Sequence, residues 1–319
     1  MREVPKLAVI VPCYNEEQVL YETTKRLSAV LEDLISKNKI KKDSFILYID
    51  DGSGDNTWSI IKSLATQNLL VGGVKLSKNK GHQNALLAGM EHVEGKCDCL
   101  ISIDADLQDD IVVIRDMIEK YLDGNEIVYG VRSNRDSDSF FKKITAEYFY
   151  KIMGIFGVEL VYNHADYRLI SSNVNTCFLK FQETNLFIRG IIPSMGFKTD
   201  KVYYIRLDRF AGESKYPLRK MLAFAWDGIT SFSVVPLRFI TLIGFIIFLG
   251  SLVMGGGVVY SAIIGKTIQG WASTVLPIYF IGGIQLMSLG IIGEYIGKIY
   301  KETKRRPRYF IEDIVDAKS

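Results

Sequence analysis

The sequence predicts an α/β domain with a doubly wound, mostly parallel sheet, followed by interfacial helices and a two-helix transmembrane hairpin. Three observations lead to this prediction. Apolar runs of strand length alternate with helical patterns over residues 1–130, polar residues follow the first four runs, and two long uncharged stretches lie near the C-terminus. Alternating strands and helices are typical of right-handed βαβ units, which build parallel sheets covered by helices on both faces.

The first strand is expected at residues 6–15, where a continuous apolar run ends in turn residues, as in a strand buried on both faces. A helix is expected to follow at 16–36, because Leu20, Leu27 and Leu31 recur with helical spacing. By the same criteria, further strands with their turns are expected at 44–55, 71–77, 97–106 and 126–132, and further helices at 57–67, 79–93 and 111–123.

Polar clusters follow the first four predicted strands, with the sequences YNEE, DDGSGDN, NKGHQ and DADLQDD. In open parallel sheets ligands bind beyond the carboxyl ends of the strands, so we expect these clusters to form one site. The first strand-to-helix turn, PCYNEE, lacks the glycines that cradle a pyrophosphate, and no Walker loop is present. The sequence therefore excludes a Rossmann dehydrogenase. A nucleotide bound here needs its phosphates held by a metal and by side chains.

The acidic cluster DADLQDD places four carboxylates within seven residues. In an extended chain residues i and i+2 point the same way, so Asp104 and Asp106 can share one cation, with Gln108 adding a neutral oxygen. Ligation by oxygen alone suits Mg²⁺ or Mn²⁺ together with substrate phosphates. The alternative is a helix N-terminus with acidic capping residues, and Asp109 and Asp110 fit that alternative equally well.

The uncharged stretches at residues 239–265 and 267–293 have 27 residues each. As helices they are roughly 40 Å long, against a hydrocarbon core of about 30 Å, and they predict a transmembrane hairpin. A pair of buried core helices is the alternative. Segments 139–156 and 217–238 mix aromatic and basic residues and are expected either to lie at the membrane interface or to pack on the domain.

Positive charge concentrates at residues 298–308, with six Lys and Arg residues and one Glu. The whole chain carries +3, so the remainder carries 3 − 5 = −2. Only Lys266 lies between the two stretches and no signal peptide precedes the first strand, so both ends of the hairpin are expected in the cytoplasm. The basic segment is expected beside anionic lipid, with nucleic-acid binding as the alternative. The four cysteines are expected to be reduced, buried fillers.

The motifs VPCYNEE, DDGSGDNT, NKGHQNALLAG, DADLQDD, DYRL and RFAGESKY resemble the successive motifs of family 2 glycosyltransferases with the GT-A fold. Within that family they are similar to the polyprenyl-phosphate glycosyltransferases, relatives of dolichol-phosphate mannose synthase and the bactoprenol glucosyltransferases. The C-terminal GEYIGKIYKETKRRPRYFI resembles the bacterial members. Two positions depart from the family pattern: Ile111 stands where relatives usually have Pro, and His82 where many have Lys or Arg.

The resemblance implies roles for individual residues. Its donor-binding set is Pro12, Tyr14, Glu16, Asp50, Asp51 and Asp104, and its metal ligands are Asp104, Asp106 and Gln108 for Mg²⁺ or Mn²⁺. The diphosphate and acceptor phosphate are expected near Arg132, Arg135, Arg209, Ser214 and Lys215. The expected catalytic residues are Asp106, Asp166, Arg132 and Lys215, with Asp166 either a base or a residue that orients Arg168 or the sugar.

The implied reaction is inverting transfer of a hexose, best taken as glucose from UDP-glucose, to undecaprenyl phosphate on the cytoplasmic leaflet of a bacterial plasma membrane. Its product is a polyprenyl-phosphate sugar for cell-surface glycan modification. A lipid phosphate with a second pKa of about 6 is already an anion, so the site needs cationic positioning rather than a strong base. Open alternatives are another donor (GDP-mannose, UDP-galactose or an amino sugar) and a non-catalytic lipid- or nucleotide-binding membrane protein. A processive polysaccharide synthase is disfavoured, because a QxxRW motif and further spans are missing.

The expected partners are the nucleotide-sugar donor, the lipid acceptor, the membrane, further copies of the chain in a homo-oligomer and a separate flippase, with no nucleic acid. The chain is expected to divide into a nucleotide-sugar and metal-binding half (1–130), an acceptor half (131–216), an interfacial segment (217–236), two transmembrane helices (237–265 and 270–294) and a basic cytoplasmic tail (295–319).

Overall fold

The computed structural model describes residues 2–133, 164–183, 187–205, 235–264 and 271–317. The chain folds into two compact units. The first comprises residues 1–151, 159–216 and 306–319, and the second comprises residues 152–158 and 217–305. The segments 139–156 and 217–234, for which an interfacial position is expected, lie outside the described residues.

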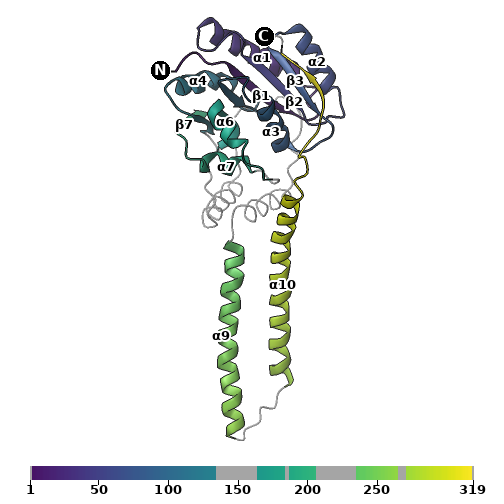
Figure 1. Ribbon diagram of the computed structural model, residues 1–319, viewed down its shortest axis with the longest axis vertical. Coiled ribbons are helices and arrows are strands. Elements are labelled where there is room, and N and C mark those ends of the chain that lie inside the picture. The colour runs from purple at the N-terminus through teal and green to yellow at the C-terminus, as the bar shows by residue number, and fades with distance from the viewer. Residues whose placement is uncertain (1, 134–163, 184–186, 206–234, 265–270, 318–319) are drawn as a thin grey trace. The chain divides into compact units, whose positions relative to one another are not determined.

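An eight-stranded sheet forms the centre of the first unit, with the strand order β7-β5-β6-β4-β1-β2-β3-β8. Figure 1 labels β1, β2, β3 and β7 of this sheet. The pairs β1–β2, β1–β4, β2–β3 and β5–β7 are parallel, and β3–β8, β4–β6 and β5–β6 are antiparallel. The predicted α/β class with a mostly parallel sheet is confirmed. The strands are β1 (Leu7–Cys13), β2 (Phe45–Asp50), β3 (Val71–Leu76), β4 (Cys99–Ser102), β5 (Ile127–Arg132), β6 (His164–Ser171), β7 (Thr199–Tyr204) and β8 (Ile311–Val315).

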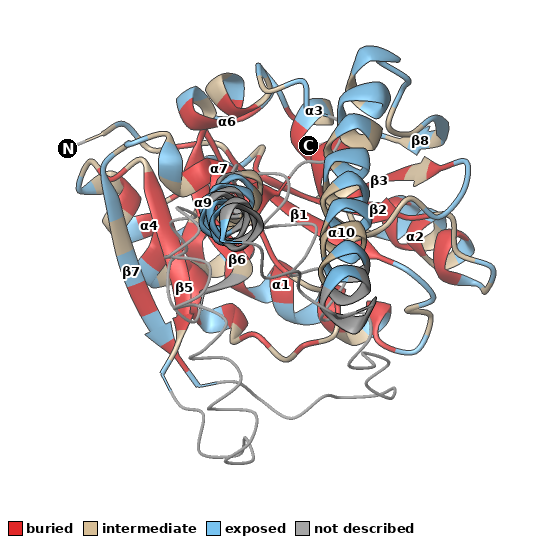
Figure 2. Ribbon diagram, turned by 90° about the horizontal axis from the view of Figure 1, so that it is seen from below, coloured by how far each residue is buried: buried red, intermediate tan, exposed pale blue. Residues whose placement is uncertain are grey.

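Helices cover both faces of the sheet. Val9 and Val11 of β1 belong to the same buried cluster as Leu27 and Ile118, whereas the intervening Ile10 faces Gly89 on the opposite side. This alternation buries both faces of the central strands (Figure 2) and explains why their sequences are continuously apolar. The helices are α1 (Leu20–Ser36), α2 (Thr57–Gln67), α3 (His82–His92), the 3₁₀ turn η1 (Ile111–Val113), α4 (Ile114–Leu122), α6 (Ser172–Phe178) and α7 (Ile188–Ser194).

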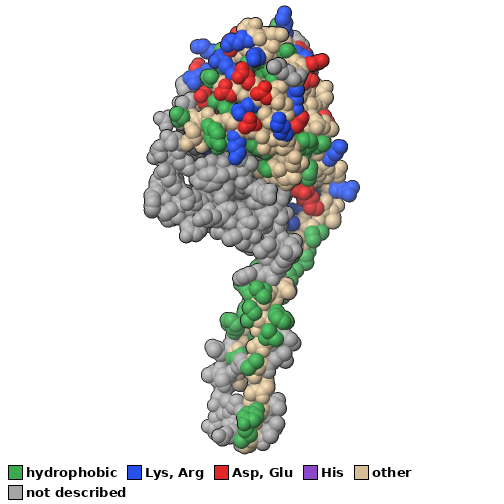
Figure 3. All heavy atoms as spheres, turned by 90° about the vertical axis from the view of Figure 1, so that its left-hand side faces the viewer, with side chains coloured by type: hydrophobic (Ala, Val, Ile, Leu, Met, Phe, Trp, Pro, Cys, Tyr) green, Lys and Arg blue, Asp and Glu red, His purple; other side chains and the backbone are tan. Residues whose placement is uncertain are grey.

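Two long helices, α9 (Val235–Ile263) and α10 (Trp271–Thr303), belong to the second unit. Within the described residues, one segment, Phe280–Thr303, is long and apolar enough to cross a membrane, and its apolar window is not buried at all. Large apolar side chains such as Val253 and Leu286 are exposed on these helices, and Figure 3 shows hydrophobic side chains along them. This arrangement differs from the alternative of a pair of buried core helices. A transmembrane hairpin stays a proposal.

Gly89 lies where α3 packs on β1 and β2, and it generates a prediction about stability. A Cβ atom at this position would lie 2.5 Å from Ile10 Cγ2 and 3.1 Å from Ile49 Cγ1. Gly89→Ala should therefore lower the free energy of unfolding by roughly 1–3 kcal/mol through overpacking. Thermal unfolding of the full chain in mild detergent measures this. Gly54→Ala is the matched control, because nothing lies within 4 Å of its Cβ position. Equal melting temperatures for the two variants would contradict the prediction.

Candidate functional site

The loops after β1, β2 and β3 are held together by hydrogen bonds at the carboxyl edge of the sheet. Asn15 donates its backbone N–H to Ser53 Oγ (2.9 Å) and accepts from Gly54 N at its side-chain Oδ1 (2.9 Å). Asp51 accepts from the backbone N–H groups of Lys80 (2.7 Å) and Gly81 (2.8 Å). Three of the four polar clusters predicted to form one site are thus joined directly.

Asp50, the last residue of β2, and Asp51, which follows it, have different surroundings. Both carboxylate oxygens of Asp51 are used to hold the loop after β3, so this residue has a local structural role. Asp50 accepts from Ser53 N at Oδ1 (3.1 Å), and within the described part of the chain its buried Oδ2 has no hydrogen-bond partner. Burial raises the pKa of both carboxyls. Among the residues expected to bind the donor, Pro12 is buried in β1, whereas Tyr14 beyond it is 48% exposed.

The acidic loop 104–110 follows β4, and its side chains alternate in exposure. Asp104, Asp106 and Gln108 are partly exposed, whereas Ala105 and Leu107 between them are buried. Strand β4 ends at Ser102, before this loop, so the alternation does not come from extended chain, and a shared set of oxygen ligands stays a prediction. The loop is fixed at Ala105, whose carbonyl accepts from Thr23 Oγ1 of α1 (2.9 Å). The chain turns at Leu107, which has a φ of +57°.

The other two acids of the loop face different partners. Asp109 is buried and accepts from Tyr204 Oη (2.5 Å) and Arg132 Nη2 (3.4 Å). Asp110 accepts from Val112 N (3.0 Å) and caps η1, which is the alternative role considered from the sequence. Arg132, expected near the phosphates, is therefore held against the acidic loop from the end of β5. Asp106 accepts from the backbone N–H of Gln108 at Oδ1 (3.2 Å) and, like Asp104, is partly exposed.

A basic cluster surrounds Asp166 at the start of β6. Arg189 of α7 donates to Asp166 through Nε (3.0 Å) and Nη2 (2.7 Å), and Arg168 donates to the same carboxylate. His82 Nε2 lies 3.5 Å from Asp166 Oδ2 and 3.7 Å from Asp104 Oδ1. His82 therefore links the basic cluster to the acidic loop, and opposite charges alternate across the edge of the sheet.

The environment of Asp166 distinguishes between the two roles left open for it. Burial alone would raise the pKa of this carboxyl, but Arg189, His82 and Arg168 outweigh burial and hold the pKa well below its usual range. A general base works best with a pKa near the working pH. The contacts therefore favour Asp166 as the residue that orients the arginines. Burial lowers the pKa of His82, but Asp104 and Asp166 overcome this effect and raise it to about 9.

Arg189 was not predicted from the sequence. It is a single basic residue in the apolar run FIRGII, and its partner Asp166 lies 23 positions earlier, so no local pattern indicates its role. His82 was noted only as a departure from the family pattern. The predicted residues Arg135, Arg209, Ser214 and Lys215 lie outside the described residues.

The donor set of the acidic loop fits a hard divalent cation. Two carboxylates and one amide supply only oxygen, which suits Mg²⁺ or Mn²⁺ completed by substrate phosphates and water. Burial raises the pKa of Asp104, and although His82 opposes this, the nearby acids Asp109, Asp166 and Asp106 add to it. A cation would relieve that repulsion. No group of three or more His, Cys, Asp or Glu side chains in the described ranges is arranged to hold a metal by itself.

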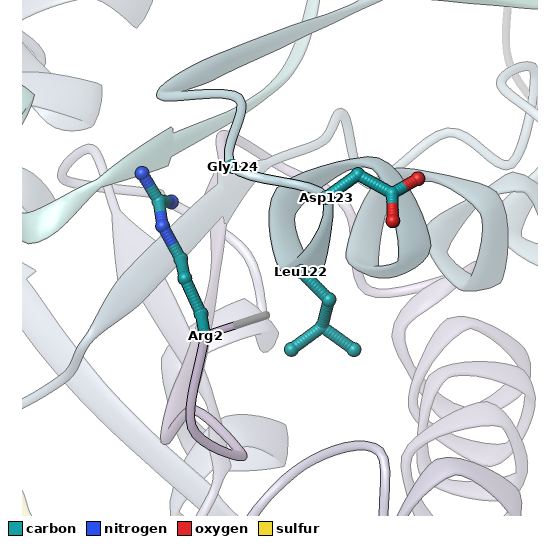
Figure 4. Close-up of a pocket in the computed structure, with 4 residues that line it drawn as sticks. All are labelled: Arg2, Leu122, Asp123 and Gly124. Atoms are coloured by element: carbon teal, nitrogen blue, oxygen red, sulfur yellow. The ribbon is translucent and has the colours of Figure 1, made fainter.

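A hollow of about 390 Å³ lies at the opposite ends of the strands, where β1 and β5 begin (Figure 4). It is lined by Arg2, Leu122, Asp123 and Gly124. These residues precede β1 or β5, and β5 runs in the same direction as β4 because both are antiparallel to β6. The hollow therefore lies away from the acidic loop and is not part of the candidate site.

Comparisons with known proteins agree on one family. The model of Glycosyl transferase family 2 matches residues 8–181, more than half of the chain. A Bacillus subtilis (strain 168) protein described as an uncharacterized glycosyltransferase, YkoT, is 53% identical over 97% of this chain and 91% of its own length. An Escherichia coli (strain K12) prophage bactoprenol glucosyl transferase homolog is 40% identical over 97% of this chain and 99% of its own. The bactoprenol glucosyl transferase of Shigella phage SfX is 39% identical over 96% and 99%.

Asp166→Asn should destabilise the protein, because Arg168 is 1% exposed and would lose its carboxylate partner. Breaking such a buried pair costs about 3–5 kcal/mol. The folded pKa of Asp166 lies below its unfolded value of about 3.9. Its contribution is therefore complete above the unfolded pKa and is lost as the pH falls through the folded pKa.

The difference in melting temperature between the wild type and Asp166→Asn should thus be largest near neutral pH and shrink below about pH 4. Thermal unfolding followed by circular dichroism across this range measures it. Asp123→Asn is the matched control, because Asp123 is exposed. A difference that stays constant with pH would contradict this assignment of the Asp166 charge.

Proposed function

The chain belongs to glycosyl transferase family 2, and on that basis we propose that it transfers a hexose from a nucleotide sugar to a polyprenyl phosphate. We take UDP-glucose as donor and undecaprenyl phosphate as acceptor, on the cytoplasmic leaflet of a bacterial plasma membrane. The names of the relatives from Escherichia coli and Shigella phage SfX, which specify bactoprenol and a glucosyl group, support the lipid acceptor and the glucosyl unit. The observation that carries the proposal is the alternation of Asp104, His82, Asp166 and Arg189 at the carboxyl edge of the sheet.

The order of the strands divides the site into a donor side and an acceptor side. Pro12 lies in β1 and Asp50 ends β2, and the loops after these strands carry Tyr14, Glu16 and Asp51. We assign this set to the nucleoside, with Asp51 acting through the loop after β3 that it holds. The loop after β4 carries Asp104, Asp106 and Gln108, which would hold Mg²⁺ or Mn²⁺. When bound, the ion supplies stabilisation of the negative charge that builds on the leaving diphosphate. On the other side of β4, β6 carries Asp166 and β5 ends in Arg132.

Transfer needs little proton chemistry from the protein. An oxygen of the acceptor phosphate attacks the anomeric carbon while the bond from that carbon to the diphosphate breaks, and this direct displacement inverts the configuration. The acceptor phosphate is largely ionised at neutral pH, so no side chain has to remove a proton. A depressed pKa at Asp166 agrees with this chemistry. Asp166 then serves to hold Arg189, and we assign Arg132, Arg135, Arg209, Ser214 and Lys215 to the two phosphate groups.

The sheet supports a topology with two crossings of the membrane. Strand β8 follows α10 in the chain, yet it pairs with β3, which precedes α9. A chain that leaves a sheet and returns to the same sheet crosses a membrane an even number of times. If Phe280–Thr303 is one crossing, α9 is the candidate for the other, because its 29 residues span about 44 Å. The basic residues at 298–308 then favour cytoplasmic ends.

The second unit also bears on the proposed partners. Large apolar side chains are exposed on both long helices, and two helices alone bury little of this surface. We therefore propose a homo-oligomer, and a mainly monomeric species in mild detergent would argue against it. Two helices per chain also provide no evident path for a sugar-linked lipid, so we assign its movement across the membrane to a separate flippase.

Asp106→Ala should abolish transfer without preventing folding. Membranes that contain the protein are incubated with Mg²⁺, undecaprenyl phosphate and radiolabelled UDP-glucose, beside GDP-mannose, UDP-galactose and amino-sugar donors. Label should enter an organic-extractable, acid-labile lipid from UDP-glucose and fall by about 100-fold or more in the variant, because the ion loses a carboxylate ligand. Asp123→Asn should transfer normally. If no donor labels the lipid while nucleotide still binds, the proposed reaction is wrong.

Single-cysteine labelling tests the two-crossing topology. Cys13, Cys97 and Cys99 are buried, so Cys177→Ser provides a background with few reactive thiols. In that background Ile264→Cys, after α9, should react with a membrane-impermeant maleimide on intact cells. Lys304→Cys, after α10, should react only once the cells are permeabilised. Labelling of both positions from the same side would exclude the hairpin.

A further inference from the structure

The residues after α10 return to the first unit and complete its sheet. We name residues 308–317 the C-terminal strap. Its strand β8 pairs antiparallel with β3, in the register Gly73↔Val315, Val74↔Ile314 and Lys75↔Asp313. Without the strap, β3 would be an edge strand with a row of unpaired backbone groups. Residues 311–315 lie within the segment that the sequence suggested as a basic tail, so this strand was not foreseen.

Side chains on both sides fasten the strap. Asp313 accepts from Trp58 Nε1 (3.2 Å) and pairs with Lys62 (2.7 Å) on α2. Glu312 pairs with Lys75 of β3 (2.8 Å). Each exposed ion pair contributes little alone. Together with the backbone pairing, these contacts fix the register of β8.

The backbone of the strap lies close to Gly72 of β3. A Cβ atom at this position would lie 2.9 Å from the backbone nitrogen of Ala317 and 3.0 Å from the carbonyl oxygen of Val315. A side chain here could be accommodated only if the backbone of the strap moved. The first glycine of the VGGV sequence in β3 is thus required by the strap.

The strap also contacts two segments that lead to the candidate site. Ser77 donates its backbone N–H to the carbonyl of Phe310 (2.9 Å), just before the loop that ends at His82. Arg308 donates through Nη2 to the carbonyls of Phe181 (3.2 Å) and Glu183 (2.6 Å). Glu183 precedes Arg189 by six positions. Both His82 and Arg189 are therefore preceded by backbone that the strap holds.

The link from the strap to α10 is short. Helix α10 ends at Thr303, and five residue steps lead to Arg308. At an extended spacing of about 3.6 Å per residue, these two positions are at most about 18 Å apart. Helix α10 contains Phe280–Thr303, the segment able to cross a membrane. Any movement of the sheet away from the end of this helix is limited to that length.

We propose that the C-terminal strap is a tether that keeps the transfer site within reach of a lipid surface. The proposal rests on the proposed function, because a lipid acceptor makes the distance to the membrane matter. While β8 pairs with β3, the chain joins the sheet to α10 through a link of five residue steps, and this short link raises the effective concentration of the site at the bilayer. Lengthening the link should lower that concentration and leave the site itself intact.

The test inserts about ten glycine and serine residues between Arg305 and Arg306 of the full chain. Transfer is measured to undecaprenyl phosphate in vesicles and to a short, water-soluble prenyl phosphate. The rate with the vesicle acceptor should fall roughly fivefold, as expected when a flexible link is lengthened several times, and the rate with the soluble acceptor should stay unchanged. The same insertion at Gly95, in the exposed turn between α3 and β4, is the matched control and should change neither rate.

The tether proposal is wrong if the insertion variant and the unmodified chain transfer to the vesicle acceptor at equal rates. It is also wrong if the insertion lowers the rates with the vesicle acceptor and the soluble acceptor by the same factor. A second measurement, which does not depend on glycosyl transfer, follows the distance between the first unit and the lipid surface. A fluorophore on Lys42→Cys, in the Cys177→Ser background, reports energy transfer to dyes on lipid headgroups. The insertion at 305–306 should lower this transfer, and unchanged transfer would also overturn the tether. If the unmodified chain glycosylates neither phosphate, the proposed function fails while the fluorescence result still stands.

Gly72→Val tests the pairing of the strap with β3 while the length of the link stays unchanged. The valine side chain cannot fit against Val315 and Ala317, so the strap should leave β3. Backbone amides of residues 311–315 should then exchange hydrogen rapidly, and energy transfer to the lipid dyes should fall as it does with the insertion. Rapid exchange with unchanged energy transfer would contradict the tether.

Discussion

The parallel pairing of β1 with β2 and β4 is the constraint on which the site depends. Because these strands run in one direction, their loops meet at one edge, where Asn15 contacts Ser53 and Asp51 contacts Lys80. The pairing brings together acids that are far apart in the sequence, and that concentration of charge must be balanced. Many of the hydrogen bonds and ion pairs at this edge offset the negative charge of these acids.

The negative charges of these acids are stabilised in different ways. Asp51 is stabilised by backbone N–H groups, Asp109 by Arg132 and Tyr204, and Asp110 by its place at the start of η1. Two arginines hold Asp166. Asp104 lies beside His82, and both Asp104 and Asp106 are partly exposed. Their partial exposure, like charge and oxygen chemistry fit the divalent ion and the diphosphate of the proposed function.

The first five strands and the acidic loop could be predicted from the sequence, because apolar runs and the acidic motif are local patterns. Strands β6 and β8 are different, since β6 inserts between β4 and β5 and β8 pairs with a strand about 240 positions earlier. No periodicity encodes such long-range pairing. The same limit applies to Arg189, whose role follows from a partner in another element. The state of Asp166 was equally beyond sequence reasoning, because its pKa depends on burial and on three cationic neighbours.

The late position of β8 in the chain also constrains how the sheet is completed. Domains generally fold from the N-terminus as the chain is made, so β1, β2, β3 and β4 are available long before β8. During that interval β3 is an edge strand, and the glycines Gly72 and Gly73 give it little apolar surface of its own to present. The edge closes only after both long helices have been synthesised, because the strap follows α10. Completion of the catalytic sheet is therefore coupled, through chain order alone, to the appearance of the segment that can enter a membrane.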